Sequence, residues 1–269
     1  MNNAAQVNGT WQGAGVTVNA ASVQVDPGSS VNADGQGYLA LAGPGAGGQG
    51  NEIGGSYGGL GGGQTANLTY GSASAPVDLG SGGGVYNAST GVGGGAIRLI
   101  VTGTLTNNGI ISANGAPVTG SGGGGAGGSV YVTTSTLAGS GIFTANGGAD
   151  TNNYGNGGGG GRVAIYYASP TSFTGFSTSV AAGGTPSGSV GTVAFFDASV
   201  PNSNVSIYQN YVLPANSNVL YNSLTVANGA TVTVGGGSQV VVAGTLHVTG
   251  SMLAQSINNV GQVNGLWAG

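Results

Sequence analysis

Glycine is the feature that most restricts what this chain can fold into. It accounts for 61 of the 269 residues and is concentrated in runs that recur along the sequence. Because each interior glycine costs a helix about 1 kcal/mol relative to alanine, helices are nearly excluded. The apolar residues between the runs are mainly Val, Ile, Leu and Tyr, and they alternate with other residues as in pleated strands. We therefore expect an all-β chain of short strands separated by Asn-Gly and Asp-Gly turns.

A repeat of 32 residues lies in the middle of the chain. Residues 104–115 (TLTNNGIISANG) and 136–147 (TLAGSGIFTANG) are identical at most positions, and a glycine run precedes each of them. A third run, 157–161, precedes RVAIYY. A strand-and-turn unit of this length is typical of one coil of a β-solenoid, in which each coil stacks on the next at about 4.8 Å. The sequence predicts a right-handed parallel β-helix or solenoid with glycine-rich insertions.

An antiparallel sandwich or barrel is the main alternative fold. It explains the alternation of apolar residues but explains the 32-residue repeat less naturally. In the solenoid, equivalent residues form columns, so Asn114 and Asn146 are candidates for an asparagine ladder at a turn. The expected inward column of the first coil is Leu99, Val101, Leu105 and Ile110.

The glycine runs have two interpretations. The first is a flexible linker or mobile loop, as composition alone indicates. The second is an ordered polyglycine-II arrangement, with three residues per turn and hydrogen bonds between neighbouring backbones. The runs recur in step with the predicted coils, which favours the second interpretation. A phosphate-binding loop of the P-loop type needs a lysine, and the chain has none.

A second, longer repeat links the two ends of the sequence. Residues 258–269 (NNVGQVNGLWAG) match residues 2–13 (NNAAQVNGTWQG) at eight of twelve positions, at a constant offset of 256. Both tryptophans, Trp11 and Trp267, lie in this repeat, together with Asn8 and Asn264. We expect one period of a longer array, with the repeated segment as the junction between modules.

The expected organisation is one elongated repeat module over residues 1–269. Its glycine-rich section spans about residues 43–165, and its C-terminal solenoid coils span about residues 200–269.

Charge is unusually scarce, which excludes several classes of function. Only 3% of the residues are charged, and there is neither lysine nor cysteine. Nucleic-acid binding needs clustered basic residues, and membrane insertion needs about 18 consecutive apolar residues, so neither is expected. The composition instead fits an extracellular or cell-surface bacterial protein.

The two cations, Arg98 and Arg162, each precede an apolar strand. Aligning Leu99 with Val130 and Val163 predicts Arg98, Ser129 and Arg162 in one outward column. We expect each arginine either to bind carboxylates or carbonyls beside the glycine runs or to be solvated.

Residues with catalytic chemistry are few. His247 is the only histidine, and no carboxylate lies near it in the sequence, so a surface position is expected. No catalytic residue and no cofactor is predicted. Asp34 and Asp150 are the best candidates for a calcium ligand, although a turn-forming role fits both.

The sequence style of residues 93–167 resembles the glycine-rich repeats of very large bacterial surface and adhesin-like proteins. The residues that carry the resemblance are 122–148 followed by 157–167. The resemblance implies an extracellular structural or adhesive role. It identifies no particular activity.

We therefore expect a structural, self-associating module of an extracellular filament, sheath or giant surface protein, whose partners are copies of itself or adjoining modules. The alternative is an adhesin segment that binds glycan or a surface; a solenoid enzyme that cleaves polysaccharide is disfavoured by the missing acid–base cluster. The candidate sugar-stacking residues are Tyr131, Tyr154, Tyr166, Tyr167, Tyr208 and Tyr211, for which core packing is the other explanation.

Overall fold

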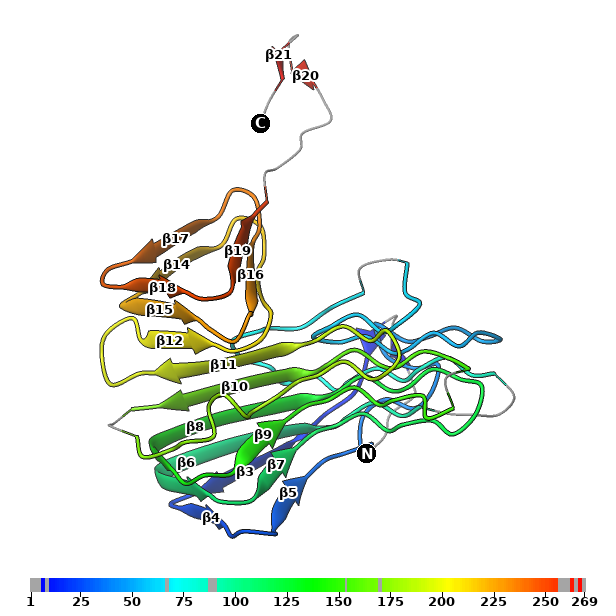
Figure 1. The fold of residues 1–269 in the computed structure, drawn as a ribbon, viewed down its shortest axis with the longest axis horizontal. Helices are drawn as coiled ribbons and strands as arrows, with labels where there is room; N and C mark the ends of the chain where they lie inside the picture. Colours follow the sequence, from blue (N-terminus) through cyan, green and yellow to red (C-terminus); the bar gives the residue numbers. More distant parts are fainter. Residues whose placement is uncertain are drawn as a thin grey trace.

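A computed structural model describes residues 6–7, 10–65, 68–86, 91–152, 154–168, 171–255, 262–263 and 266–267. These residues form strands, turns and extended segments, and none of them lies in a helix. Most strand pairs are parallel, as Figure 1 shows. The all-β class predicted from the glycine and β-branched residues is confirmed.

The largest sheet has nine strands in the order β18-β15-β12-β11-β10-β8-β6-β3, with β4 paired to β6 beside β3. Its neighbours are parallel except β11 and β12, which are antiparallel. The strands are β3 (Val16–Ala20), β4 (Val23–Val25), β6 (Ala96–Asn107), β8 (Ser129–Ala138), β10 (Arg162–Tyr167), β11 (Thr192–Asp197), β12 (Asn204–Ile207), β15 (Ser223–Val226) and β18 (Leu246–Val248).

Smaller sheets accompany it. One has the order β5-β7-β9, with β5 (Ser30–Asn32), β7 (Ile110–Ser112) and β9 (Ile142–Thr144). Another has the order β13-β16-β19, with β13 (Tyr211–Leu213), β16 (Thr231–Val234) and β19 (Ser251–Ala254), and β14 (Asn218–Tyr221) pairs with β17 (Gln239–Val242). Two antiparallel hairpins remain: β1 (Gln6–Val7) with β2 (Thr10–Trp11), and β20 (Gln262–Val263) with β21 (Leu266–Trp267).

The 32-residue repeat of the sequence lies in register in space. Leu105 of β6 pairs with Leu137 of β8, and Ile110 of β7 pairs with Ile142 of β9. Nearer the start of β6 the offset is 33, since Ala96 pairs with Ser129, and the register shifts between Val101 and Thr104. The two repeat units are therefore adjacent layers of the same sheets.

The C-terminal part is built from shorter layers. Successive strands enter three sheets in turn: β12, β13 and β14 first, then β15, β16 and β17, then β18 and β19. These strands form the upper part of the molecule in Figure 1.

Two apolar cores follow from this arrangement. The larger one fills the space on one face of β6, β8 and β10, and it includes Leu99, Leu105 and Val132. In strand β7 the prediction is wrong by one residue: Ile110 is 43% exposed, and Ile111 is fully buried in its place. The second core lies among β11–β13, β15 and β16 and contains Phe196, Tyr211 and Leu224.

The glycine runs are buried and packed against one another. In Figure 1 these connections run side by side beyond one end of the long strands. An added Cβ on Gly128 would lie 1.8 Å from the carbonyl oxygen of Gly95, and one on Gly158 would lie 2.0 Å from that of Gly125. Only glycine permits this close approach of backbones. We call these segments the glycine array: residues 45–62, 80–84, 91–95, 113–116, 122–128, 147–148, 156–161 and 183–191.

The hydrogen-bond partners in the glycine array recur every third residue. From residue 123 to residue 128, consecutive N–H groups donate in rotation to three neighbouring segments, 81–84, 156–159 and 113–116. The six pairs are Gly123 to Gly84, Gly124 to Asn156, Gly125 to Ala116, Ala126 to Ser81, Gly127 to Gly159 and Gly128 to Ala113. Residues 123–128 lie mostly outside the paired strands, yet each of their buried N–H groups has a hydrogen-bond acceptor.

Candidate functional site

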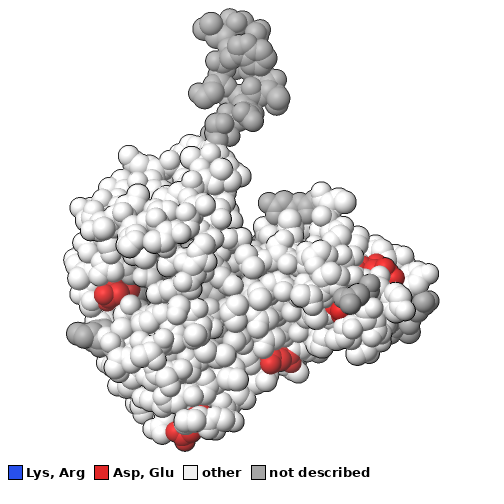
Figure 2. All heavy atoms as spheres, viewed as in Figure 1, with Lys and Arg blue, Asp and Glu red and all other residues white. Residues whose placement is uncertain are grey.

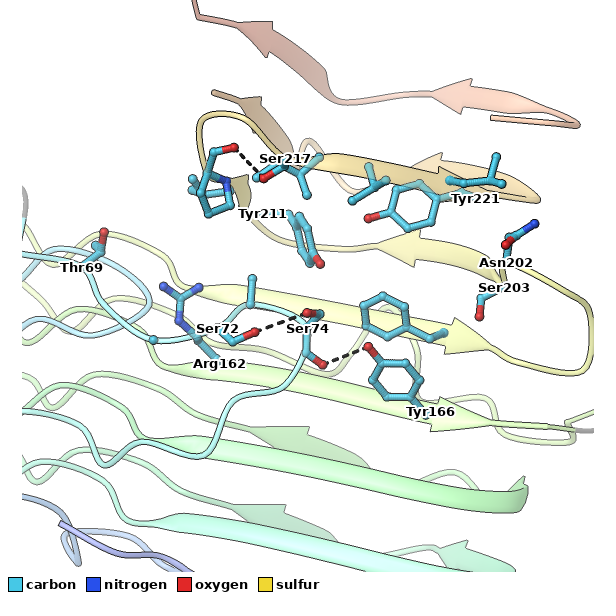
Figure 3. Close-up of a pocket in the computed structure, with 18 of the residues that line it drawn as sticks. Thr69, Ser72, Ser74, Arg162, Tyr166, Asn202, Ser203, Tyr211, Ser217 and Tyr221 are labelled. Carbon is cyan, nitrogen blue, oxygen red and sulfur yellow. Dashed lines mark hydrogen bonds between the residues drawn. The ribbon is translucent and has the colours of Figure 1, made fainter. Parts of the chain in front are cut away.

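The described residues form a groove of about 820 Å³ that we call the tyrosine groove. It lies between the loop 69–74, which connects segments of the glycine array, and the C-terminal layers (Figure 3). Strand β10 contributes Arg162 and Tyr166, and β11 contributes Phe196. The remaining lining residues are 202–203, 211–214, 217 and 219–221.

Arg162 is 4% exposed and lies at the base of this groove. Its Nε and Nη2 atoms donate to the carbonyl oxygen of Tyr70 at 3.1 and 2.8 Å, and Nη1 donates to the Thr192 hydroxyl at 3.2 Å. The guanidinium also lies 5.3 Å from the centre of the Tyr57 ring. Among the described residues, no carboxylate forms an ion pair with Arg162.

Burial lowers the pKa of the Arg162 guanidinium from its usual value, and nearby Tyr57 and Asp78 oppose that shift. Burial also raises the pKa of the Asp78 carboxyl from its usual value, against the opposing effect of Arg162. Both shifts show that the surroundings disfavour charge. The guanidinium nevertheless stays cationic at neutral pH, because the ordinary arginine pKa lies above about 12.

Aromatic side chains form the walls of the groove. Tyr166 stacks on Phe196 with ring centres 4.2 Å apart and planes 4° from parallel, and Tyr131 meets Tyr166 edge to face. The Tyr166 hydroxyl donates to the carbonyl oxygen of Ser74 at 3.0 Å. Burial raises the pKa of the Tyr166 and Tyr211 hydroxyls well above the usual value.

The six tyrosines considered for sugar stacking do not share one face. Tyr166 and Tyr211 line the groove, and Tyr131 packs beside them. Tyr167 and Tyr208 instead pack against Phe176. Tyr154 is 70% exposed.

The predicted arginine column is wrong. Arg98 pairs across the sheet with Tyr131, whereas Ser129 pairs with Ala96 on one side and Arg162 on the other. The two arginines are therefore two positions apart along the strands. The prediction aligned Leu99 with Val130, an offset of 31, whereas Leu99 pairs with Val132, an offset of 33. Arg98 is exposed, and its guanidinium lies 5.3 Å from the centre of the Tyr131 ring.

The structure brings Asn114 and Asn146 together. The backbone N–H of Asn146 donates to the Asn114 side-chain oxygen at 2.7 Å, and the N–H of Ala182 donates to the Asn146 oxygen at 2.8 Å. Below them, the N–H of Asn114 donates to the Asp34 carboxylate at 2.6 Å. Asp34, Asn114 and Asn146 thus occupy successive layers and link the turns that follow β5, β7 and β9.

The two copies of the long repeat have the same backbone pairing. Gln6 pairs with Trp11 in one hairpin, and Gln262 pairs with Trp267, 256 residues later, in the other. The Trp11 ring packs edge to face on Tyr38 at 5.5 Å. Asn8 and Asn264 lie outside the described residues.

The large sheet ends in strands with exposed apolar side chains. In β3, Val16 is 66% and Val18 is 42% exposed. In β18, at the opposite edge, Leu246 is 50% and Val248 is 39% exposed. Each of these strands has one neighbour in the sheet among the described residues.

The acidic residues and the single histidine, which could take part in catalysis or metal binding, are dispersed over the structure. Figure 2 shows acidic side chains as small separate patches on an otherwise uncharged face. Asp150 accepts the backbone N–H groups of Asn152 and Gly155 within a turn, and His247 is exposed on β18. Within the described ranges, no three His, Cys, Asp or Glu side chains gather, and no helix is long and apolar enough to cross a membrane.

Sequence reasoning missed the partners of Arg162. Tyr70 is 92 residues away from it in the chain, and nothing in the sequence around Tyr57 or Tyr70 indicates a contact with β10. A comparison with protein-family models, curated proteins and solved structures finds no match for this chain.

Proposed function

We propose that this chain is a structural, non-catalytic module that associates with copies of itself, or with adjoining modules of the same kind, in an extracellular filament, sheath or giant surface protein. In this proposal the layered parallel sheets are a right-handed β-solenoid, and the glycine array is polyglycine II. The adhesin alternative, in which the module binds glycan, depends on the tyrosine groove.

The observation that carries the proposal is the pair of sheet edges. Strands β3 and β18 present backbone hydrogen-bonding groups together with exposed Val16, Val18, Leu246 and Val248. An exposed apolar edge strand is a template for another strand, and soluble domains usually protect such an edge with charge, proline or a bulge. Neither strand has a charged residue or a proline. Because β11 and β12 are antiparallel, β3 and β18 run in opposite directions. In a second copy with the same orientation, β3 would therefore extend the sheet at β18 as an antiparallel neighbour.

The hydrogen-bond pattern of the glycine array supports the polyglycine-II assignment. A backbone with three residues per turn directs successive N–H groups in three directions, about 120° apart. Partners that rotate among three neighbouring segments are what this geometry produces. The glycines of this array have no side chains to order, and the proposed role of the array is therefore rigid spacing.

The repeated hairpins support a modular array. Both copies pair Gln with Trp at the same hairpin position, 256 residues apart.

The scarcity of charge supports an extracellular location, because such a surface differs from that of most cytosolic proteins. The resemblance to glycine-rich bacterial surface proteins agrees with both.

The test is assembly of the purified chain over a wide concentration range, followed by sedimentation velocity and negative-stain electron microscopy. We expect concentration-dependent linear oligomers. Val18→Lys and Leu246→Lys should each suppress them, because a charge on the edge opposes strand addition. Ile110→Lys is the matched control: its side chain is 43% exposed but lies on β7, which has a neighbour on both sides.

A chain that stays monomeric throughout the range contradicts the proposal. Oligomers that all three variants form equally well contradict the assignment of the interface to β3 and β18.

A further inference from the structure

We propose that the tyrosine groove is a binding site for a carboxylated saccharide, such as a uronic-acid disaccharide, with the carboxylate held by Arg162. This inference goes beyond the structural role proposed above and does not depend on it.

The first argument is the incomplete hydrogen bonding of the buried Arg162 guanidinium, which Asp78 influences electrostatically without forming an ion pair. A buried guanidinium without a carboxylate partner is costly, because desolvation is not offset by an ion pair. A guanidinium has five N–H groups. Three hydrogen bonds, two to Tyr70 and one to Thr192, leave two of these N–H groups without an acceptor among the described residues. An anion in the groove would supply an acceptor for these N–H groups and the ion pair that Asp78 does not form.

The second argument is the orientation of this group. Figure 3 shows the guanidinium of Arg162 directed from β10 into the groove, on the side where Tyr211 enters from β13. The contacts with Tyr70 and Thr192 hold the guanidinium in place before any ligand arrives. A fixed planar donor is well suited to a carboxylate, which accepts two parallel N–H bonds.

The third argument concerns the rest of the lining, which fits a sugar better than a simple anion. Ser72, Ser203, Ser217 and Asn202 provide short hydroxyl and amide groups around the groove. Tyr221 and the exposed Leu220 provide apolar surface for a sugar ring. Neutral hydroxyl and amide groups match the hydroxyls of a sugar. Their number exceeds what a small carboxylate such as acetate needs.

Size and charge narrow the ligand further. A volume of about 820 Å³ lies in the range of small-molecule sites, about 300–1,000 Å³. No second basic residue lines the groove. A saccharide with at most one carboxylate per ring, of which a single one binds Arg162, therefore fits better than a polyphosphate or a densely sulfated sugar, which needs several cations.

The test is isothermal titration calorimetry of the full chain with α-1,4-digalacturonate, with the neutral disaccharide α-1,4-galactobiose as the matched ligand. We expect digalacturonate to bind about tenfold more tightly or better, since its carboxylate can accept charge-assisted N–H bonds from Arg162. Equal affinity for the two disaccharides would overturn the role of Arg162. The absence of heat from both would overturn the site.

Variants locate the site. Leu220→Trp should fill the groove and abolish binding, whereas Ile110→Trp, a similarly exposed residue on β7, should leave it unchanged. Arg162→Gln should reduce the affinity for digalacturonate to that for galactobiose. Arg162 also supports the loop at Tyr70, so the Arg162→Gln result counts only if the circular dichroism spectrum of this variant is native. If the spectrum is not native, Leu220→Trp alone tests the site.

Two further outcomes count against the proposal. Acetate that displaces digalacturonate at a similar concentration would indicate a general anion site. Unchanged binding in Leu220→Trp would place the ligand elsewhere. Repeating the titration on Val18→Lys separates this inference from self-association, because that substitution lies on β3, outside the groove.

Discussion

At the scale of single residues, the two arginines of this chain have opposite environments although each lies near the start of its strand. Arg162 is buried and donates three hydrogen bonds, whereas Arg98 is exposed on the same sheet. Arg162→Gln should lower the free energy of unfolding by about 2 kcal/mol, because the carbonyl of Tyr70 loses a charged donor inside the structure. Arg98→Gln should change it by less than about 0.5 kcal/mol. Urea denaturation measures both, and equal stability of the two variants would refute the structural role of Arg162.

The sequence has both arginines shortly after a glycine run, Arg162 directly and Arg98 after Ala96 and Ile97. It could not predict which one is buried. That depends on the loop carrying Tyr57 and Tyr70, which reaches β10 from about 92 residues away. Single-residue registers were equally hard to predict: Ile110 and Ile111 are both suitable strand residues, and only the turn before them decides which one faces the core.

At the scale of elements, the turns after β7 and β9 are joined by side chains of identical type. The Asn114 oxygen accepts the Asn146 N–H in the next layer. Asn114→Ala leaves that donor without its partner, so we expect a loss of about 1–2 kcal/mol in the free energy of unfolding. Asn218→Ala, on the exposed surface of β14, is the control and should be close to neutral. A neutral Asn114→Ala in thermal denaturation would show that solvent satisfies the donor equally well.

The layer-to-layer repeat is the part of the fold that the sequence predicted best. Identical residues 32 positions apart are paired in β6 with β8 and in β7 with β9, because stacking puts equivalent residues at equivalent places. The antiparallel step from β11 to β12 was not predicted. No repeat marks it, since β11 follows the last glycine run and β12 starts the shorter layers.

At the scale of the whole molecule, few groups titrate, and the most strongly perturbed ones are buried phenols. Burial raises the pKa of Tyr57, Tyr70, Tyr166 and Tyr211, and it raises the pKa of Tyr167 to about 12. The folded state therefore binds these protons more tightly than the unfolded chain, whose tyrosines titrate near pH 10. Their contribution to stability is complete below pH 10 and is lost as the pH rises from about 10 to 12 and above.

We accordingly expect the free energy of unfolding to fall steeply above about pH 10. Urea denaturation at a series of pH values, with tyrosinate absorbance recorded in parallel, checks this. Tyr211→Phe should make the alkaline decline shallower, because it removes one buried ionisable group. Complete tyrosinate formation in the native protein, without loss of stability, would contradict the assignment of these phenols to the interior.

The three-residue rotation of partners in the glycine array also restricts how such a chain can change in length. An insertion of one or two residues in a run such as 122–128 would turn every later N–H towards the wrong neighbour, whereas an insertion of three would restore the original directions. Related chains should therefore gain and lose residues within these runs in multiples of three, because only such changes keep every later N–H group directed at its original neighbour.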